Sequence, residues 1–168
     1  MLPGATAPLG YNLPGSIGAA VGGKKRNVIC ITGDGSLQTN IHELGTIAVN
    51  SLPIKIFVLN NGGYLSIRIT QKTYFEGRYI GESKETGLGF PDLKKIADAY
   101  GLTYYLAKDN TSLKNVLPDL FKHKGPLLCE IICKKWQTVA PTVTSKTLSD
   151  GTMISTPIDD MFPFLSKE

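Results

Sequence analysis

A chain of 168 residues has room for one domain with a substantial core, and is short for two domains of ordinary size. Its 42% hydrophobic and 19% charged residues are typical of a globular protein. The net charge of +4 is small and the lysines are scattered, which argues against a nucleic-acid-binding role.

Strand-like and helix-like segments alternate along the chain. The strands are predicted from short apolar runs, and the helices from apolar residues spaced three or four apart. In chain order, the expected elements are a strand over 27–32, a helix over 41–50, a strand over 54–59, a helix over 91–100, a strand over 103–106, a helix over 112–122 and a strand over 127–133. Asn40 is a candidate N-cap for the first helix, with Glu43 as its capping-box partner.

Continuous apolar strands separated by helices predict an α/β fold, in which a doubly wound, mostly parallel sheet has helices on both faces. We expect this domain to cover residues 1–135. Residues 136–168 are rich in Pro, Thr and Ser, and we expect them to form an irregular C-terminal tail.

Three cysteines, Cys30, Cys129 and Cys133, fall in apolar strand-like runs. They indicate buried, reduced thiols, and therefore a reducing compartment such as the cytoplasm. Paired Cys or His spacings typical of zinc sites are absent from the sequence. No apolar run reaches the roughly 18 residues of a membrane span, and the sequence shows no signal peptide. The abrupt opening on Met-Leu-Pro-Gly-Ala-Thr-Ala-Pro resembles the middle of a longer protein.

Two glycine-rich polar motifs follow directly after predicted strands. They are Gly33-Asp34-Gly35-Ser36 and Asn60-Asn61-Gly62-Gly63. Ligands of parallel sheets bind beyond the carboxyl ends of the strands, so both motifs should meet at one edge. Either motif alone could be a tight turn, but together they offer hard oxygen ligands and backbone N–H groups. Such a set suits Mg²⁺ and a phosphate group.

The motif pair resembles the signature of thiamine-diphosphate enzymes, which is GDGS followed by Asn-Asn. Asp34 and Asn61 are 27 residues apart (61 − 34), which fits the spacing of that family. Leu-Gly-Tyr-Asn-Leu-Pro from Leu9, and the later Tyr-Phe-Glu-Gly-Arg-Tyr and Phe-Pro-Asp-Leu-Lys-Lys runs, are similar to the acetolactate-synthase branch. The resemblance extends over residues 5–133. Asn12 departs from it, since the branch usually has glycine there, and Leu9 often corresponds to methionine.

The resemblance implies two sets of site residues. The Mg²⁺ ligands would be the side chains of Asp34 and Asn61 and the backbone carbonyl of Gly63. The cofactor-binding residues would be Leu9, Gly33, Gly35, Ser36, Asn61, Gly63 and Tyr64. Within this set Leu9 would lie beneath the bent cofactor, and Tyr64 would pack near it or in the core.

The resemblance also implies an activity. It is decarboxylation of a 2-keto acid, followed by transfer or release of the resulting acyl carbanion equivalent. The activating glutamate of the family lies in a separate pyrimidine-binding domain, for which this chain has no room. We therefore expect no catalytic residue in this chain, and the isolated chain should be inactive. The expected partners are a pyrimidine-binding domain or subunit, further copies in a homo-oligomer and a small 2-keto acid, with no nucleic acid and no membrane.

Other polar residues are weaker candidates. Glu43 is expected to cap a helix or lie at an interface, and His42 to lie at the surface or at an interface rather than to shuttle protons. Arg68 and Gln71 follow the second motif, where they either touch substrate or lie on a solvated helix face. Trp136 has no functional interpretation.

Two other readings of the motifs stay open. One is a non-catalytic phosphate- or nucleotide-binding module, and the other is a structural domain that retains the motif. A dinucleotide-binding module would need a third glycine in Gly-x-Gly-x-x-Gly, but Gln38 stands at that position. A Gly-Lys-Ser/Thr phosphate loop is absent from the sequence as well. Whether the chain is a fragment or a natural small subunit is also open.

Overall fold

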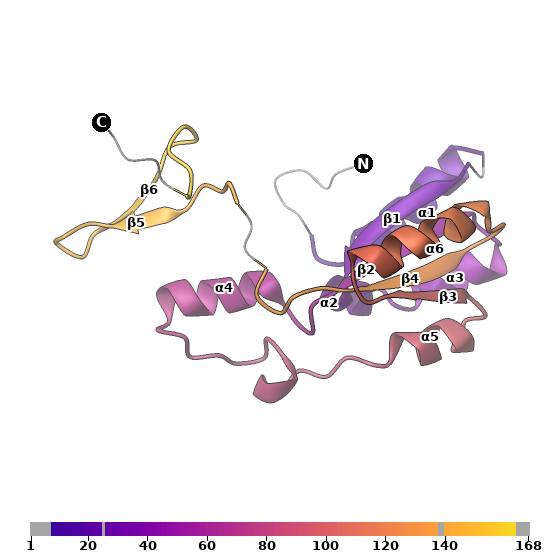
Figure 1. Ribbon diagram of the computed structural model, residues 1–168, viewed down its shortest axis with the longest axis horizontal. Helices are drawn as coiled ribbons and strands as arrows, with labels where there is room; N and C mark the ends of the chain where they lie inside the picture. Colours follow the sequence, from indigo (N-terminus) through magenta and orange to yellow (C-terminus); the bar gives the residue numbers. More distant parts are fainter. Residues whose placement is uncertain (1–7, 25, 138–139, 164–168) are drawn as a thin grey trace. The chain divides into compact units, whose positions relative to one another are not determined.

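The computed structural model describes residues 8–24, 26–137 and 140–163 (Figure 1). The chain forms two compact units, residues 1–136 and 137–168. The first unit holds the sheet and all the helices of the described chain, and the second holds a short hairpin.

The first unit is built on a four-stranded parallel sheet. Its strands are β1 (Val28–Gly33), β2 (Ile54–Asn60), β3 (Thr103–Ala107) and β4 (Leu127–Ile132). Their order in the sheet is β1-β2-β4-β3, and every neighbouring pair is parallel. The carboxyl ends of β1 and β2 lie side by side, since Gly33 pairs with Leu59. The predicted α/β class is therefore confirmed.

Among the described residues, six α-helices and one 3-10 helix precede or connect the strands. They are α1 (Asn12–Gly22), α2 (Asp34–Thr39), α3 (Glu43–Val49), α4 (Leu65–Tyr74), η2 (Lys84–Thr86), α5 (Leu93–Ala99) and α6 (Asn110–Lys122). The Gly-rich helix α1 was not predicted, because its sequence lacks a clear apolar stripe. Its Pro14 lies in the first turn, where the missing N–H costs no helical hydrogen bond.

The predicted cap at Asn40 is wrong. Asn40 ends α2, and its side-chain amide donates to the carbonyl of Gly10 at 3.0 Å. The chain then makes a tight turn, so that α3 begins at Glu43 after His42, with no side-chain cap. The predicted helix over 41–50 is accordingly shorter. The Glu43 side chain does not cap the helix. Its Oε1 lies 3.7 Å from Nε2 of His42, whose side chain is exposed.

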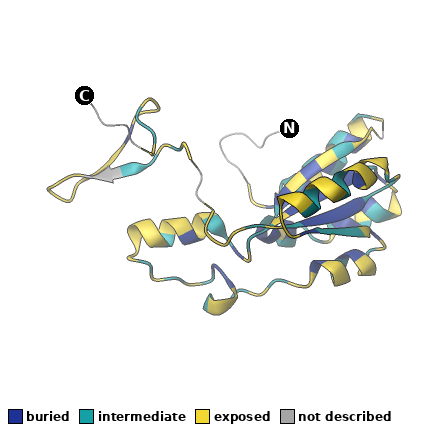
Figure 2. Ribbon diagram, viewed as in Figure 1, coloured by how far each residue is buried: buried dark blue, intermediate teal, exposed yellow. Residues whose placement is uncertain are grey.

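The sheet has a core on each face. On one face, side chains of β2 and β4 such as Ile56 and Leu128 pack against α1, α2, α3 and α5. On the other face, Phe57, Leu127 and Cys129 pack against Leu120 of α6. Figure 1 shows α5 and α6 on opposite sides of β3 and β4, and Figure 2 shows β2 and β4 largely buried while α4 is mostly exposed.

The three cysteines are free, as expected, but they are not equally buried. Cys30 and Cys129 lie in the two cores, whereas Cys133 is only half-buried. The expectation of three buried thiols is therefore wrong for Cys133, which lies just beyond the end of β4, outside both cores.

In the second unit, β5 (Ser145–Thr147) pairs antiparallel with β6 (Met153–Ser155). The expected irregular tail thus contains a hairpin. Across both units, none of the helices that the structure describes has the length and apolar character needed to cross a bilayer.

Candidate functional site

The two glycine-rich motifs meet at the carboxyl edge of the sheet, around the side chain of Asp34. This residue begins α2 directly after β1, and its side chain is buried. Its Oδ1 accepts the N–H of Gly35 at 2.8 Å, and its Oδ2 accepts the N–H of Gly63 at 3.0 Å. The Asp34 carboxylate therefore links the motif after β1 to the turn after β2.

Burial disfavours the ionised form of the Asp34 carboxyl group. Desolvation raises the pKa of its carboxyl group, although backbone N–H groups from Gly35, Gly63, Gly62 and Asn61 act in the opposite direction. The net shift is upward, so the ionised form is poorly compensated by the protein alone. A bound cation would provide the missing compensation.

Asn61 supplies a second oxygen that lacks a partner. Its side-chain Oδ1 is buried, and no donor of the described residues lies within hydrogen-bond distance. A buried acceptor without a partner costs about 1–3 kcal/mol, so it calls for an explanation, and a bound ion is one. A carboxylate and an amide oxygen are hard ligands of the type that Mg²⁺ takes together with phosphate oxygens.

A metal ion at Asp34 and Asn61 would need further ligands that are not acidic side chains. The described part of the chain holds no cluster of three or more His, Cys, Asp or Glu residues that could bind a metal. This fits Mg²⁺ bound by one carboxylate, one amide, backbone and cofactor oxygens, and it does not fit an all-protein cage. The residues at this edge therefore fit Mg²⁺ and a diphosphate group.

Glycine is needed at Gly63 and Gly35 because neighbouring groups occupy the space of a side chain. A Cβ on Gly63 would lie 2.0 Å from the carbonyl oxygen of Glu82, whose oxygen also accepts the N–H of Tyr64 at 2.9 Å. A Cβ on Gly35 would lie 2.2 Å from the Tyr64 ring. Tyr64 in turn packs edge-on against Phe90, with ring centroids 5.7 Å apart. Tyr64 thus packs directly against Gly35, the residue that follows Asp34.

The upstream turn at Leu9 also reaches this edge. Ser36 Oγ accepts the N–H of Gly10 at 2.9 Å and donates to Oδ1 of Asn12 at 3.1 Å. Asn12, which departs from the pattern of the branch, also donates to the Ile31 carbonyl. The Ser36 hydroxyl is therefore engaged within the chain, and Leu9 stands 56% exposed beside it.

Arg68 does not lie on a solvated helix face, so that reading of the sequence is wrong. Its side chain is fully buried and forms an ion pair with buried Glu82, with Nε and Oε2 2.5 Å apart. Its Nη1 donates to the Lys135 carbonyl, and its Cζ lies 5.4 Å from the ring centroid of Trp136. Trp136, uninterpretable in the sequence, thus covers a buried cation.

Gln71 is engaged by backbone. Its side-chain amide donates to the Ile80 carbonyl at 2.9 Å and accepts the Ile80 N–H at 3.1 Å.

Sequence reasoning also missed two buried acids, Glu82 and Glu130. The only signal for Glu130 was an acidic residue inside the apolar run Leu-Leu-Cys-Glu-Ile-Ile.

Comparisons with known proteins show the family of this chain. Residues 1–131 match the family described as "Thiamine pyrophosphate enzyme, C-terminal TPP binding domain". The chain is 34% identical over 143 residues to acetolactate synthase of Arthrospira platensis, covering 85% of this chain and 24% of that protein. It is 38% identical over 122 residues to the acetolactate synthase large subunit of Porphyra purpurea, covering 73% of this chain and 20% of that protein.

A solved structure is similar as well. The thiamine diphosphate-dependent 4-hydroxybenzoylformate decarboxylase of Rhodococcus jostii RHA1 matches with a TM-score of 0.70 at 26% identity. The match covers 80% of this chain and 25% of that one. The chain thus spans about a quarter or less of the length of these relatives. On the motifs, the fold and these matches, the chain belongs to the thiamine pyrophosphate enzyme family and corresponds to its C-terminal TPP-binding domain.

Proposed function

We propose that this chain holds the diphosphate end of thiamine diphosphate and its Mg²⁺ ion. The complete enzyme would be of the acetolactate-synthase type, decarboxylating a 2-keto acid and transferring or releasing the resulting acyl carbanion equivalent. The observation that carries the proposal is the pair formed by buried Asp34 and the unpartnered Oδ1 of Asn61 at one edge of the sheet. The match over residues 1–131 supports the choice of cofactor.

In this proposal the Mg²⁺ ligands are the side chains of Asp34 and Asn61 and the carbonyl of Gly63. The diphosphate contacts fall on Gly33, Gly35 and Ser36, chiefly through backbone, because the Ser36 hydroxyl is already bonded to Gly10 and Asn12. Leu9 and Tyr64 would provide apolar surface against the cofactor, Leu9 through its exposed side chain.

When bound, the cofactor supplies an electron sink for the carbanion that decarboxylation leaves. The chain's own residues contribute position and charge. Asp34 stays fixed by two backbone N–H groups, so its carboxylate is oriented before a metal binds. Tyr64, packed on Gly35 and Phe90, would limit how far the backbone next to Asp34 can move.

The activating carboxylate would come from a pyrimidine-binding domain or subunit, and the complete enzyme would be a homo-oligomer. Support comes from the relatives, whose length is at least about four times the region that this chain matches. The three free cysteines support a reducing compartment such as the cytoplasm.

Calorimetric titration of the chain with thiamine diphosphate, with and without Mg²⁺, tests the site. Binding should require Mg²⁺ and should weaken at least about tenfold in Asp34→Ala and Asn61→Ala, since each removes a direct ligand. Asp98→Ala and Asn115→Ala, which remove the same side-chain types from exposed helix positions, are the matched controls. Unchanged binding in both site variants would refute the assignment.

Two further measurements separate the alternatives. Tight binding of NAD or ATP in a thermal-shift screen would favour a nucleotide-binding module. The chain with cofactor and Mg²⁺ should release no carbon dioxide from pyruvate, because the activating carboxylate is supplied by another domain. Measurable release would show that this chain activates the cofactor itself.

A further inference from the structure

Glu130 is a buried acid in the middle of an apolar sheet face. It lies in β4, in register with Val58 of β2 and Leu106 of β3, and its exposed fraction is 9%. Among the described residues, no Lys, Arg or His forms an ion pair with it. A carboxylate in such a place is rare unless hydrogen bonds compensate its burial.

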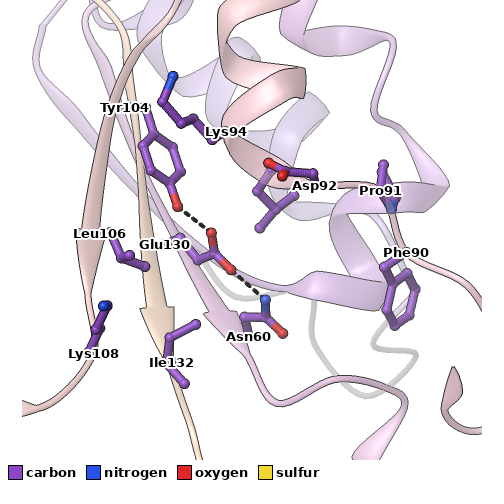
Figure 3. Close-up of a pocket in the computed structure, with 11 residues that line it drawn as sticks. Asn60, Phe90, Pro91, Asp92, Lys94, Tyr104, Leu106, Lys108, Glu130 and Ile132 are labelled. Atoms are coloured by element: carbon purple, nitrogen blue, oxygen red, sulfur yellow. Dashed lines mark hydrogen bonds between the residues drawn. The ribbon is translucent and has the colours of Figure 1, made fainter.

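Two neutral donors provide that compensation (Figure 3). Glu130 Oε1 accepts the side-chain amide of Asn60 at 2.5 Å, and Oε2 accepts the hydroxyl of Tyr104 at 2.5 Å. Burial, together with the hydrogen bond and charge of Glu130, raises the pKa of Tyr104, so its hydroxyl stays protonated as a donor. Hydrogen bonds to an ionised acceptor are stronger than neutral ones.

The Asn60 side chain connects Glu130 to the turn that follows β2. While its Nδ2 faces Glu130, its Oδ1 accepts the N–H of Gly62 at 3.0 Å. The amide orientation is fixed at both ends, because a flipped amide would put acceptor against acceptor and donor against donor. The Asn60 carbonyl also accepts the Cys133 N–H at 2.7 Å, which ties the ends of β2 and β4.

We propose that Glu130 is a positioning residue for the metal-binding turn, acting through Asn60. The chain of contacts runs from Tyr104 to Glu130, to Asn60 and to Gly62, and so reaches both sides of Asn61. It fixes the turn whose Asn61 Oδ1 is left free for a ligand and whose Gly63 N–H holds Asp34. This inference rests on the proposed function, since it assigns Asn61 to the metal.

The network lines a cavity of about 700 Å³, with Asn60, Tyr104 and Glu130 in its wall (Figure 3). The Tyr104 ring also packs against the first core, so a test substitution there should keep the ring. Tyr104→Phe removes only the hydroxyl. Tyr105→Phe is its matched control, because Tyr105 packs against the core on the opposite face.

Glu130 is tested by two substitutions that differ in what they keep. Glu130→Leu removes both acceptors while suiting the apolar face. Glu130→Gln keeps an acceptor for Asn60, and its amide can donate to the Tyr104 oxygen. Partial rescue by Gln is therefore expected of a positioning role.

The first readout needs no cofactor. Hydrogen exchange of the Gly62 amide in the ligand-free chain should be about tenfold faster in Glu130→Leu and faster in Tyr104→Phe, because the bond that protects it loses its support. Exchange in Glu130→Gln should lie between that of Glu130→Leu and that of the unmodified chain, and Tyr105→Phe should match the unmodified chain. If Glu130→Leu does not fold, the Gly62 exchange rate in Tyr104→Phe still tests the proposal. Unchanged Gly62 exchange in every folded variant would overturn the proposal.

The second readout is calorimetric titration with thiamine diphosphate and Mg²⁺. Glu130→Leu should weaken binding about tenfold and Glu130→Gln less, if the turn presents a metal ligand. Asp34→Asn is included to separate the two hypotheses. Normal binding in Asp34→Asn would refute the proposed metal site itself. Loss of binding in Asp34→Asn with normal binding in Glu130→Leu would overturn only the role of Glu130.

Discussion

Arg68 and Glu82 form a buried ion pair, with Arg68 Nε 2.5 Å from Glu82 Oε2 and both side chains almost fully inaccessible. The pair joins α4 to the segment of Glu82 and Ser83, and Ser83 forms a β-bridge with Gly63 in the turn after β2. The backbone carbonyl of Glu82 accepts the Tyr64 N–H and fills the space beside Gly63. Arg68 and Glu82 therefore fix one end of this turn, while Asn60 lies at the other end.

Removing one partner of this pair should destabilise the fold strongly. Glu82→Ala leaves the Arg68 guanidinium buried without its counter-ion, which costs about 3–5 kcal/mol of unfolding free energy. Asp98→Ala, which breaks the exposed pair with Lys94, is the control and should cost about 0.5 kcal/mol or less. Urea unfolding followed by circular dichroism measures both. Similar small losses in the two variants would contradict the structural role of Glu82.

The pair should also make stability depend on acid pH. Burial alone would raise the pKa of Glu82, but hydrogen bonds from Ser83 and Arg68 and the Arg68 charge outweigh it, so the pKa is lowered. A carboxyl with a lowered folded-state pKa contributes stability above its ordinary pKa and loses it as pH falls through the folded value. Unfolding free energies measured from about pH 6 to pH 3 should therefore fall less steeply in Glu82→Gln. Parallel curves would count against this linkage.

Neighbouring glycines in the turn should respond differently to alanine. In Gly63→Ala the new Cβ would meet the Glu82 carbonyl, so the turn must move and binding of thiamine diphosphate with Mg²⁺ should weaken more than about tenfold. Gly62 has a φ of 70° with open space around it, so Gly62→Ala carries only left-handed strain of about 1–2 kcal/mol. Calorimetry and urea unfolding compare the two. Equal loss of binding in both variants would show that the contact with Glu82 is not decisive.

The cysteines should react with thiol reagents in order of accessibility. Cys133 is half-buried and should be alkylated first in the folded chain. Cys30 and Cys129 are buried, and burial, aided by the charge of Glu130, raises the pKa of Cys129 to about 11, so little thiolate forms. Mass spectrometry after timed iodoacetamide treatment gives the order, and unfolding in urea should equalise the three rates. Early labelling of Cys129 would contradict the described core.

The sequence predicted the positions that depend on local patterns. Apolar runs placed the four parallel strands, and the motifs at Asp34 and Asn61 were expected to meet because each follows a strand. It failed where local patterns were weak or misleading. The Gly- and Pro-containing helix α1 has no clear stripe, and Asn40 resembles a helix cap but bonds to Gly10, which is 30 residues away.

By itself, the sequence determined the fold class, because short apolar runs encode the strands. Its two glycine-rich motifs indicated Mg²⁺ and a phosphate group, and their resemblance to the thiamine-diphosphate signature indicated the cofactor family. Only the tertiary structure decided how the site is supported. Glu130 and Asn60 are 70 residues apart, and Arg68 and Glu82 are 14 apart. Glu130 meets Asn60 because the strand order puts β4 beside β2, and Arg68 meets Glu82 because the chain folds back from α4 against Gly63. Neither arrangement follows from the spacing of residues along the chain.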